Sequence, residues 1–448
     1  MNLKQNIKYT FFTLTACAFN CDSTQVDIEN FNTQNIEVQK VVTLGGSKNE
    51  SAQSIVATLD GGYAVLGFTQ SMDGDVLSKT DNSYDFWLLK FDVNGEQEWQ
   101  KVYGGIDDDR GQDVITTKDG GYTITGSSKS IDGDVSENAG LNDFWVVKIN
   151  DLGIIEWETS LGHSGTDKCF SILQTQDNGF LVSGVIDISS LELDGCGSSS
   201  ANRHAGGDYW IIKLDAFGTL LWSKSYGGSF SDTAYSAVET QTGDFIIVGS
   251  SDSEDVDISN NKGSYDFWVL KLSSSGNMLW EKSFGGSEID RARDVALTSD
   301  GNFLITGDSR SSNNDLTNNY GVSDIWIIKI DPNGELIWEK SFGGSNFDGV
   351  QAISIAENDS FLISGNSRSS DIDLVQNKGN NDAWIFSINF HGIIQWQTNL
   401  GGSNIDLFMD VVELENGSVV AVGNTNSNDY DILENKGFSD ILLIQIKP

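Results

Sequence analysis

Positive charge is scarce in this sequence. There are 27 Lys and Arg residues against 65 Asp and Glu, which leaves a formal net charge of −38 over 448 residues. Nucleic acids and anionic membrane surfaces are bound by clustered cations, so neither is an expected partner. A cation, a neutral glycan or another protein fits this balance better, and negative charge also keeps an exported protein soluble.

Long apolar runs, helical periodicity and proline are missing as well. No stretch after residue 16 approaches the roughly 18 apolar residues of a membrane span, and none keeps a 3.6-residue apolar period, so almost no helix is expected. No Gly-rich phosphate loop, nucleophile elbow or Ser/His/Asp set is recognisable. With only two Pro and 38% hydrophobic residues, the chain has enough apolar material for a folded core.

The first residues are typical of an export signal. Lys4 and Lys8 precede the mostly apolar run Tyr9–Ala16, and such a segment is excluded from the fold. Leu14-Thr15-Ala16-Cys17 resembles the lipobox of bacterial lipoproteins, which implies cleavage after residue 16 and a lipid such as palmitate on Cys17. The alternative is a plain secretory signal followed by an ordinary thiol. Residues 17–35 are then the lipidated cysteine and a polar tether.

Tryptophan spacing reveals a repeat in residues 36–448. Six Trp are each followed by a second Trp twelve residues later, and the first members of these pairs are 58, 65, 58, 58 and 58 residues apart. These first members are Trp87, Trp145, Trp210, Trp268, Trp326 and Trp384. Glycine spacing gives the same period, because each of the seven copies begins with a glycine: Gly45, Gly104, Gly162, Gly227, Gly285, Gly343 and Gly401.

The fifth copy shows the internal design of a repeat. Alternating β-branched and aromatic residues between Gly, Asp and Asn turns predict strands at Arg291–Thr298, Phe303–Gly307, Asp324–Ile330 and Glu335–Ser341. Four antiparallel strands, repeated seven times, predict an all-β protein, a seven-bladed β-propeller.

The two ends of the repeat region predict how the ring closes. The seventh copy stops after its third strand, and Glu37-Val38-Gln39-Lys40-Val41 matches Glu98-Trp99-Gln100-Lys101-Val102 of a complete copy. Residues 36–42 are therefore predicted to be the outer strand of blade seven, which removes an exposed sheet edge.

The copies share Tyr/Phe-Gly-Gly-Ser-x-x-Asp, Asp-Gly-Gly-Tyr and Asp-x-Trp-(apolar)₂-Lys. In these motifs residues 36–448 resemble the SBBP-type β-propeller repeats of bacterial exported proteins. The resemblance implies the propeller fold and, with the lipobox, a lipoprotein of the outer membrane or cell surface. It implies no particular function, because propellers host many activities.

Acidic residues recur in two kinds of loop that are expected on one face of the propeller. The loops between blades contribute Glu50, Asp109, Asp167, Asp232, Asp290, Asp348 and Asp406. The loops between strands two and three repeat Ser-x-Asp-x-Asp, with acids at Asp73, Asp75, Asp132, Asp134, Asp255, Asp257, Asp371 and Asp373. Alternate residues of an extended segment share one side, so these carboxylates are candidate Ca²⁺ ligands. The alternative is that Ser and Asp cap turns by accepting backbone N–H bonds.

Blade three breaks the symmetry. Its loop at residues 187–207 is seven residues longer than its counterparts and carries Cys196, Arg203 and His204, while His163 replaces the second Gly of the repeat. Cys169 and Cys196 are predicted to form a disulfide in an oxidising compartment. His163, Arg203 and His204 are the candidate catalytic set of a polysaccharide lyase-like enzyme. Zinc held by the two His and two Cys is a further reading without recognisable ligand spacing.

The function expected from these features is binding rather than catalysis. The chain is interpreted as a monomeric, lipid-anchored scaffold of the cell envelope for a protein or glycan ligand, with blade three setting specificity because loops on a rigid scaffold carry recognition. Tyr209 and Tyr235 are placed to stack on a sugar ring or to pack between loops. A carbohydrate-active enzyme and a calcium-stabilised structural module are the alternatives.

Overall fold

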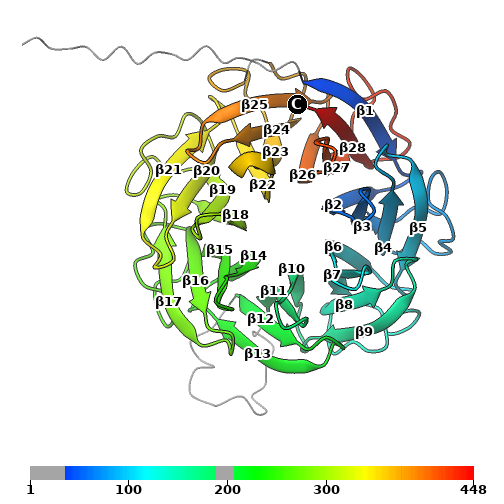
Figure 1. The fold of residues 1–448 in the computed structure, drawn as a ribbon, viewed down its shortest axis with the longest axis horizontal. Coiled ribbons are helices and arrows are strands. Elements are labelled where there is room, and N and C mark those ends of the chain that lie inside the picture. The colour runs from blue at the N-terminus through cyan, green and yellow to red at the C-terminus, as the bar shows by residue number, and fades with distance from the viewer. Residues whose placement is uncertain (1–35, 188–205, 375) are drawn as a thin grey trace, which may run out of the picture. The chain divides into compact units, whose positions relative to one another are not determined.

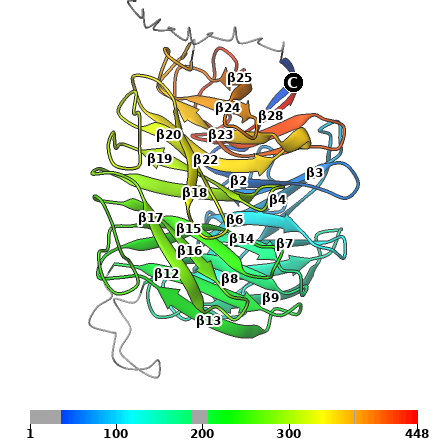
Figure 2. The ribbon, with the colours of Figure 1, turned by 60° about the vertical axis from the view of Figure 1, so that its left-hand side comes forward.

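Each repeat forms one four-stranded antiparallel sheet in the computed structural model, which describes residues 36–187, 206–374 and 376–448. Seven such sheets surround a central channel as the blades of a β-propeller (Figures 1 and 2). The first strand of each blade is innermost and the last is outermost (Figure 1). The fold predicted from the repeats is therefore confirmed.

Each of the first four blades consists of four consecutive strands. They are β2 (Glu50–Ala57), β3 (Tyr63–Thr69), β4 (Asp85–Phe91) and β5 (Gln97–Tyr103); β6 (Asp109–Thr116), β7 (Tyr122–Ser128), β8 (Asp143–Ile149) and β9 (Ile155–Leu161); β10 (Lys168–Gln174), β11 (Phe180–Ile186), β12 (Asp208–Leu214) and β13 (Leu220–Tyr226); β14 (Asp232–Glu239), β15 (Phe245–Ser251), β16 (Asp266–Leu272) and β17 (Met278–Phe284).

The strands of the last three blades follow the same order. They are β18 (Asp290–Leu297), β19 (Phe303–Ser309), β20 (Asp324–Ile330) and β21 (Leu336–Phe342); β22 (Asp348–Ile355), β23 (Phe361–Ser367), β24 (Asp382–Ile388) and β25 (Ile394–Leu400); β26 (Asp406–Glu413), β27 (Val419–Thr425), β28 (Asp440–Lys447) and, from the N-terminal end, β1 (Glu37–Leu44). In the described ranges the helical content is one 3₁₀ turn, η2 (Glu357–Asp359), and no helix is long and apolar enough to cross a bilayer.

The N-terminal strand closes the ring. β1 pairs antiparallel with β28, so that Glu37 lies opposite Lys447 and Leu44 lies opposite Ile441. The prediction of an outer strand at residues 36–42 is thus confirmed, with the strand extending to residue 44. This pairing removes the exposed edge that a three-stranded blade would have.

Tryptophan rings pack the blades against one another. The Trp326 ring is fully buried and lies 4.7 Å from the Phe267 ring of the preceding blade. Its indole N–H donates to the Glu339 carboxylate at 2.9 Å, so that burial leaves no unpaired donor. This contact needs a Trp at the same position of the third strand in each blade. The 58-residue spacing of the Trp residues therefore reflects the packing of one blade against the next.

The innermost strands each contain a β-bulge, and the bulge positions the candidate site. In β6 the pairing with β7 shifts between Gly111 and Asp113, leaving Gln112 unpaired. A bulge places an extra residue on one strand and re-aims its side chain. The unpaired residues of all seven blades line the central channel: Gln53, Gln112, Phe170, Tyr235, Arg293, Gln351 and Met409.

Candidate functional site

The acidic loops hold the glycine loops in place. In blade six, four consecutive backbone N–H groups, at residues 343–346, each donate to a side chain. Gly343 donates to Asp373 at 3.0 Å and Gly344 to Asp348 at 2.7 Å. The next two N–H groups donate to Asp371 at 2.8 Å and to the Ser369 hydroxyl at 3.0 Å. The loop after β23 thus supplies most of the acceptors for the backbone N–H groups of the glycine loop at residues 343–346.

The same bonds explain the candidate calcium ligands. Asp73, Asp132 and Asp255 accept the third N–H of their glycine loops, while Asp75, Asp134 and Asp257 accept the first. These contacts are the turn-capping alternative. In the part of the chain that the structure describes, no group of three or more His, Cys, Asp or Glu is placed to hold a metal ion. Calcium binding stays a prediction that only an experiment can test.

Pairs of carboxylates are buried at the junctions between blades. Gly285 separates Asp266 from Asp290, because a Cβ on this glycine would lie 2.5 Å from Asp266 Oδ1 and 2.7 Å from Asp290 Oδ2. Burial raises the pKa of Asp266 to about 7, and the neighbouring Asp290 adds to the rise. The repeated aspartates before the third strands are therefore scaffold residues, and they make stability depend on pH.

The predicted blade-three site lies partly outside the described residues. Cys196, Arg203 and His204 fall in residues 188–205, so neither the disulfide nor the catalytic set is tested; Cys17 also lies outside. His163 is exposed, and its backbone N–H donates to Asp167 at 2.7 Å. Cys169 is buried beside the Thr125 hydroxyl, with Sγ and Oγ1 3.1 Å apart.

The two tyrosines proposed to stack on a sugar have different environments. Tyr209 is fully buried, donates its hydroxyl to the Trp268 carbonyl at 2.9 Å, and is therefore a packing residue rather than a ligand contact. Tyr235 instead lines the channel, where its ring lies 5.1 Å from that of Phe170. Sequence reasoning did not separate them, because the burial of each depends on which face of its strand meets the next blade.

Three aspartates follow the bulge residues and join neighbouring blades across the channel wall. Asp113 accepts the Ile172 N–H at 2.9 Å, and Asp294 accepts the Ile353 N–H at 2.9 Å. Asp410 makes the equivalent bond from blade seven to blade one. Burial raises the pKa of Asp410 to about 7, and the charges of Asp294 and Asp113 add to the rise. The channel of about 270 Å³ is thus ringed by carboxyl groups with a structural task.

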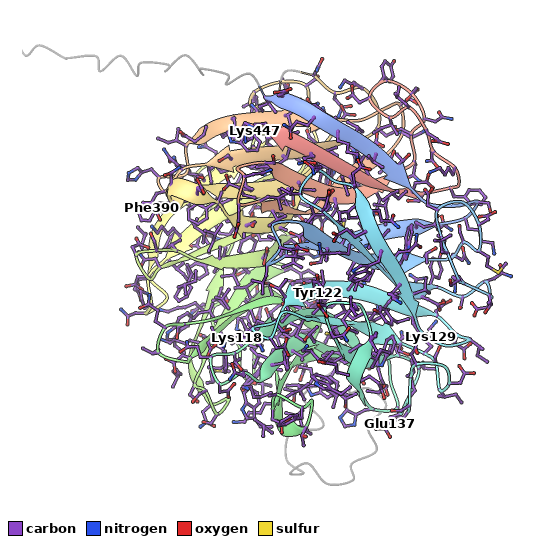
Figure 3. All side chains as sticks on the ribbon, turned by 45° about the vertical axis from the view of Figure 1, so that its right-hand side comes forward. Lys118, Tyr122, Lys129, Glu137, Phe390 and Lys447 are labelled. Carbon is purple, nitrogen blue, oxygen red and sulfur yellow. The ribbon has the colours of Figure 1, made fainter. Side chains whose placement is uncertain are left out.

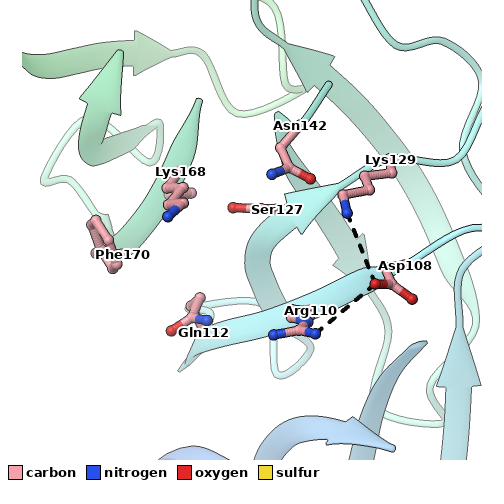
Figure 4. A pocket seen from close by; sticks show the side chains of 9 residues that line it. Asp108, Arg110, Gln112, Ser127, Lys129, Asn142, Lys168 and Phe170 are labelled. Carbon is pink, nitrogen blue, oxygen red and sulfur yellow. Dashed lines mark ion pairs between the residues drawn. The ribbon is translucent and has the colours of Figure 1, made fainter. Parts of the chain in front are cut away.

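A cavity with the opposite electrostatic character opens at the loop end of this channel. It has a volume of about 410 Å³ and lies between β6, β7 and β10 (Figure 4). Its lining residues are Asp108, Arg110, Gln112, Ser127, Lys129, Asn142, Lys168, Cys169 and Phe170. Three cations therefore stand beside one carboxylate.

The cations of this cavity are held by blades two and three. Arg110 stacks on the Tyr84 ring, with the guanidinium carbon 4.1 Å from the ring centre. Arg110 and Lys129 each lie 3.9 Å from Asp108 Oδ2, a separation at which an exposed pair contributes little energy. Lys129 directly follows β7, whereas Lys118 is in the β6–β7 hairpin, and the two stand at opposite ends of blade two (Figure 3). The cavity thus keeps positive charge available to an anion.

Four of the five arginines in the described residues lie at this end of the propeller. Arg110 and Arg291 are the second residues of β6 and β18, and Arg310 and Arg368 directly follow β19 and β23. Arg293 is the bulge residue of β18 and lies farther along the channel wall. The sixth arginine, Arg203, lies in the undescribed part of the blade-three segment. The net charge of the chain therefore does not describe the charge at the channel mouth.

A signal for this site was present in the sequence. The residue after the acid that begins each innermost strand changes from blade to blade: Ser51, Arg110, Lys168, Thr233, Arg291, Gly349 and Leu407. Loop length and rare residues single out blade three, whereas this signal is a change of charge at one position of the repeat. Only the ring places these positions together.

The fold and this mouth define a seven-bladed β-propeller with a basic cavity beside its central channel. No family model matches the chain. The regulatory protein FlaEY of Caulobacter vibrioides is 25% identical over 205 residues, which is 43% of this chain and 21% of that protein. The matched region thus spans about a fifth of the length of that relative, and the activity of the whole relative does not follow for this chain.

Solved propellers resemble the chain at low sequence identity. The Pan2 WD40 domain of Neurospora crassa is 10% identical, with a TM-score of 0.48 and coverage of 92% of this chain and 97% of that one. YCF48 bound to D1 peptide is 10% identical, with a TM-score of 0.46 and coverage of 93% and 96%. A protein of unknown function from Bacteroides caccae is 12% identical, with a TM-score of 0.41 and coverage of 76% and 97%. No function is transferred from them.

Proposed function

We propose that this chain is a non-enzymatic binding propeller of the bacterial cell envelope, whose ligand is a protein or glycan carrying acidic groups. The observation that carries the proposal is the cavity between blades two and three, where Arg110, Lys129 and Lys168 face a single carboxylate, Asp108. Guanidinium and ammonium groups bind carboxylates through charge-assisted hydrogen bonds. An acidic ligand therefore suits this cavity better than the neutral glycan or cation that the net charge favours.

Binding is preferred to turnover because the described lining offers no activated nucleophile. Burial raises the pKa of a free Cys169 thiol to about 12, so it stays protonated near neutral pH, and in the predicted disulfide with Cys196 no thiol is left. The remaining titratable groups are one aspartate and three cations. These charged groups can bind an anion. A general acid or base for catalysis would have to come from a residue outside this lining.

The envelope location rests on the N-terminal segment and on the resemblance of the repeats. The SBBP-type resemblance and the lipobox ending at Cys17 support an exported, lipid-anchored protein of the outer membrane or cell surface. Labelling cells with an alkyne analogue of palmitate is expected to mark the wild-type protein in the membrane fraction. The Cys17→Ser variant is expected to lose the label, and labelling that persists in this variant would contradict lipid attachment at Cys17.

The binding site is tested by removing its charge. In the triple variant Arg110→Gln, Lys129→Gln, Lys168→Gln, affinity for an acidic ligand such as galacturonate or polyglutamate is expected to fall at least about tenfold, since paired charges are lost. Lys101→Gln combined with Lys224→Gln on the outer strands β5 and β13 is the control for altered net charge. Equal affinity in wild type and the triple variant would contradict the site.

The same assay separates binding from catalysis. Wild-type protein is incubated with acidic polysaccharides while new unsaturated or reducing ends are measured, and no turnover is expected. Cleavage by the wild type that disappears in His204→Ala would establish the lyase-like alternative instead.

A further inference from the structure

A second group of cations stands across the channel from the cavity. Arg291 is the second residue of β18 and Arg310 directly follows β19, both in blade five. In blade six, Arg368 directly follows β23, and its Nε–H donates to the Asn381 side chain. β6 and β18 face each other across the channel (Figure 1), so the arginines of blade five oppose Arg110 and Lys129 of blade two.

The two groups occupy equivalent places in their blades. Arg110 and Arg291 both directly follow the aspartate that begins an innermost strand, and Lys129 and Arg310 both directly follow a second strand. Arg291 also copies the stacking of Arg110, because its guanidinium carbon lies 4.6 Å from the centre of the Tyr265 ring. Aromatic stacking holds each guanidinium with its N–H groups free to meet a ligand.

Within the described ranges, the ion pairs leave Arg291, Arg310 and Arg368 uncommitted. The blade-five arginine that forms an ion pair is Arg293, which lies outside this group: its Nε is 3.3 Å from Asp308 Oδ2, and that carboxylate also accepts the Val350 N–H at 2.8 Å. Arg310 and Arg368 are exposed. Blade five therefore presents positive charge of the kind found beside the cavity.

We propose that the ligand is an acidic polysaccharide that crosses the channel mouth, with one charged sugar in the cavity and others against Arg291 and Arg310. This inference rests on the proposed function and adds the ligand's length and chemical class. A polymer with a carboxylate on successive sugars places negative charge at both cation groups, whereas a single acidic group reaches only one of them. The gain from two tethered contacts follows from effective concentration.

The lining of the cavity favours a sugar over an acidic peptide. Gln112, Ser127 and Asn142 add neutral donors and acceptors to the cations, and Phe170 adds an aromatic ring. A uronic acid needs this mixture, because each ring carries one carboxylate, several hydroxyl groups and an apolar face. An acidic peptide could also hydrogen-bond these amides and this hydroxyl through its backbone, but its Asp and Glu side chains lack the apolar ring face that Phe170 can pack against.

The acidic loops limit where such a polymer can lie. Asp73 and Asp371 belong to loops between second and third strands, and their carboxylates accept N–H bonds in the neighbouring loops. These loops stay negatively charged outside the channel mouth, and they repel a polyanion that is displaced from the cations. At physiological salt this repulsion extends only about 8 Å, so it guides position without preventing binding at the centre.

The experiment measures galacturonate oligomers of increasing length by isothermal titration calorimetry. Three proteins are compared with the wild type: Arg291→Gln with Arg310→Gln, Arg110→Gln with Lys129→Gln, and the control Lys101→Gln with Lys224→Gln. The affinity of the octamer is expected to fall at least about tenfold in both mouth variants and to stay unchanged in the control. The affinity of the monomer is expected to fall only in the variant of blade two.

Each other outcome has a definite meaning. Octamer affinity that falls with the blade-two variant but is unchanged in the blade-five variant overturns the crossing polymer and leaves the proposed function intact. Absence of binding to every acidic ligand overturns both. Tighter binding of an oligoglutamate of equal charge overturns the polysaccharide class. The charge-conserving variant Arg291→Lys with Arg310→Lys is expected to recover most of the octamer affinity, and failure to do so in a protein with wild-type thermal stability contradicts the electrostatic contact.

Discussion

The Asp410 carboxylate accepts the Ile55 backbone N–H at 2.8 Å, although 355 residues separate them in the chain. Asp410 lies in the innermost strand of blade seven and Ile55 in that of blade one. The ring is therefore closed twice, by this bond at the channel and by the pairing of β1 with β28 at the outside. The closure at the channel depends on the Asp410 side chain, and the closure at the outside depends on strand β1.

Removing the inner closure is expected to destabilise the propeller. Asp410→Ala leaves the Ile55 N–H without its acceptor in a buried place, which costs about 1–3 kcal/mol. Asp410→Asn keeps an oxygen acceptor and removes the repulsion from Asp294, so its loss is expected to be smaller. Urea unfolding at pH 7 compares the two variants, and equal losses would show that the negative charge, rather than the acceptor, matters.

Removing the outer closure is expected to promote association. Deletion of residues 36–44 exposes the backbone N–H and C=O groups of β28 along its free edge, and such edges pair with other chains. Light scattering during storage and heating measures the effect. A shortened protein that stays monomeric with an unchanged thermal midpoint would argue that β28 needs no partner.

Buried aspartates are expected to make the protein more stable at mildly acidic pH. Burial raises the pKa values of Asp266 and Asp324 to about 7, from an ordinary 3.8. Between these values the folded protein binds protons that the unfolded chain has released, so stability falls as pH rises from about 4 to 7. Thermal midpoints are therefore expected to be higher at pH 5 than at pH 8. Asp266→Asn with Asp324→Asn should reduce this difference, and a midpoint that rises with pH over this range would contradict it.

Other aspartates act in the opposite direction at lower pH. Burial alone would raise the pKa of Asp300, but hydrogen bonds from Thr298 and Lys329 lower it to about 2. This carboxylate stabilises the folded state above its ordinary pKa, and the contribution is lost as pH falls toward 2. Because the raised groups lose stability above pH 4 and the lowered groups lose it below, the stability of the propeller is expected to be highest near about pH 4.

Calcium is tested by mass action. When the free Ca²⁺ concentration is one hundred times the Kd of a site, binding stabilises the folded state by about 2.7 kcal/mol per independent site. Because the candidate carboxylates already accept backbone N–H groups, thermal midpoints in millimolar Ca²⁺ and in EDTA are expected to be equal. A clear rise with Ca²⁺, lost in Asp371→Ala, would assign an ion to these loops.

The predicted Cys169–Cys196 disulfide calls for a chemical test. Mass spectrometry of protein alkylated without reduction is expected to recover a peptide pair joined through these two residues. Bridging the long loop could stabilise the fold by roughly 3.5 kcal/mol on a chain-entropy estimate. Alkylation of both thiols in the unreduced, denatured protein would rule the bridge out.

Local patterns were sufficient to predict the blades. The strand predicted at Asp324–Ile330 has the same bounds as β20, and the predicted outer strand begins one residue before β1. These features depend on alternation, turn residues and Trp spacing within one repeat, and every blade repeats the same physical problem. Repetition therefore reports the scaffold reliably and says little about what the scaffold binds.

By itself the sequence determined the seven blades, their four strands and the closing strand. The strands follow from contacts between residues close in the chain, and the closing strand follows from the match between residues 36–42 and the fourth strand that the seventh copy lacks. Only the tertiary structure decided the character of the channel mouth. Arg110 and Lys168 line one cavity although they come from different blades, and Arg291 lies in β18, which faces β6 across the channel (Figure 1). The ring brings these equivalent positions to the same channel. An overall charge of −38 hides this, since charge sums over the whole chain whereas a ligand meets only the local arrangement.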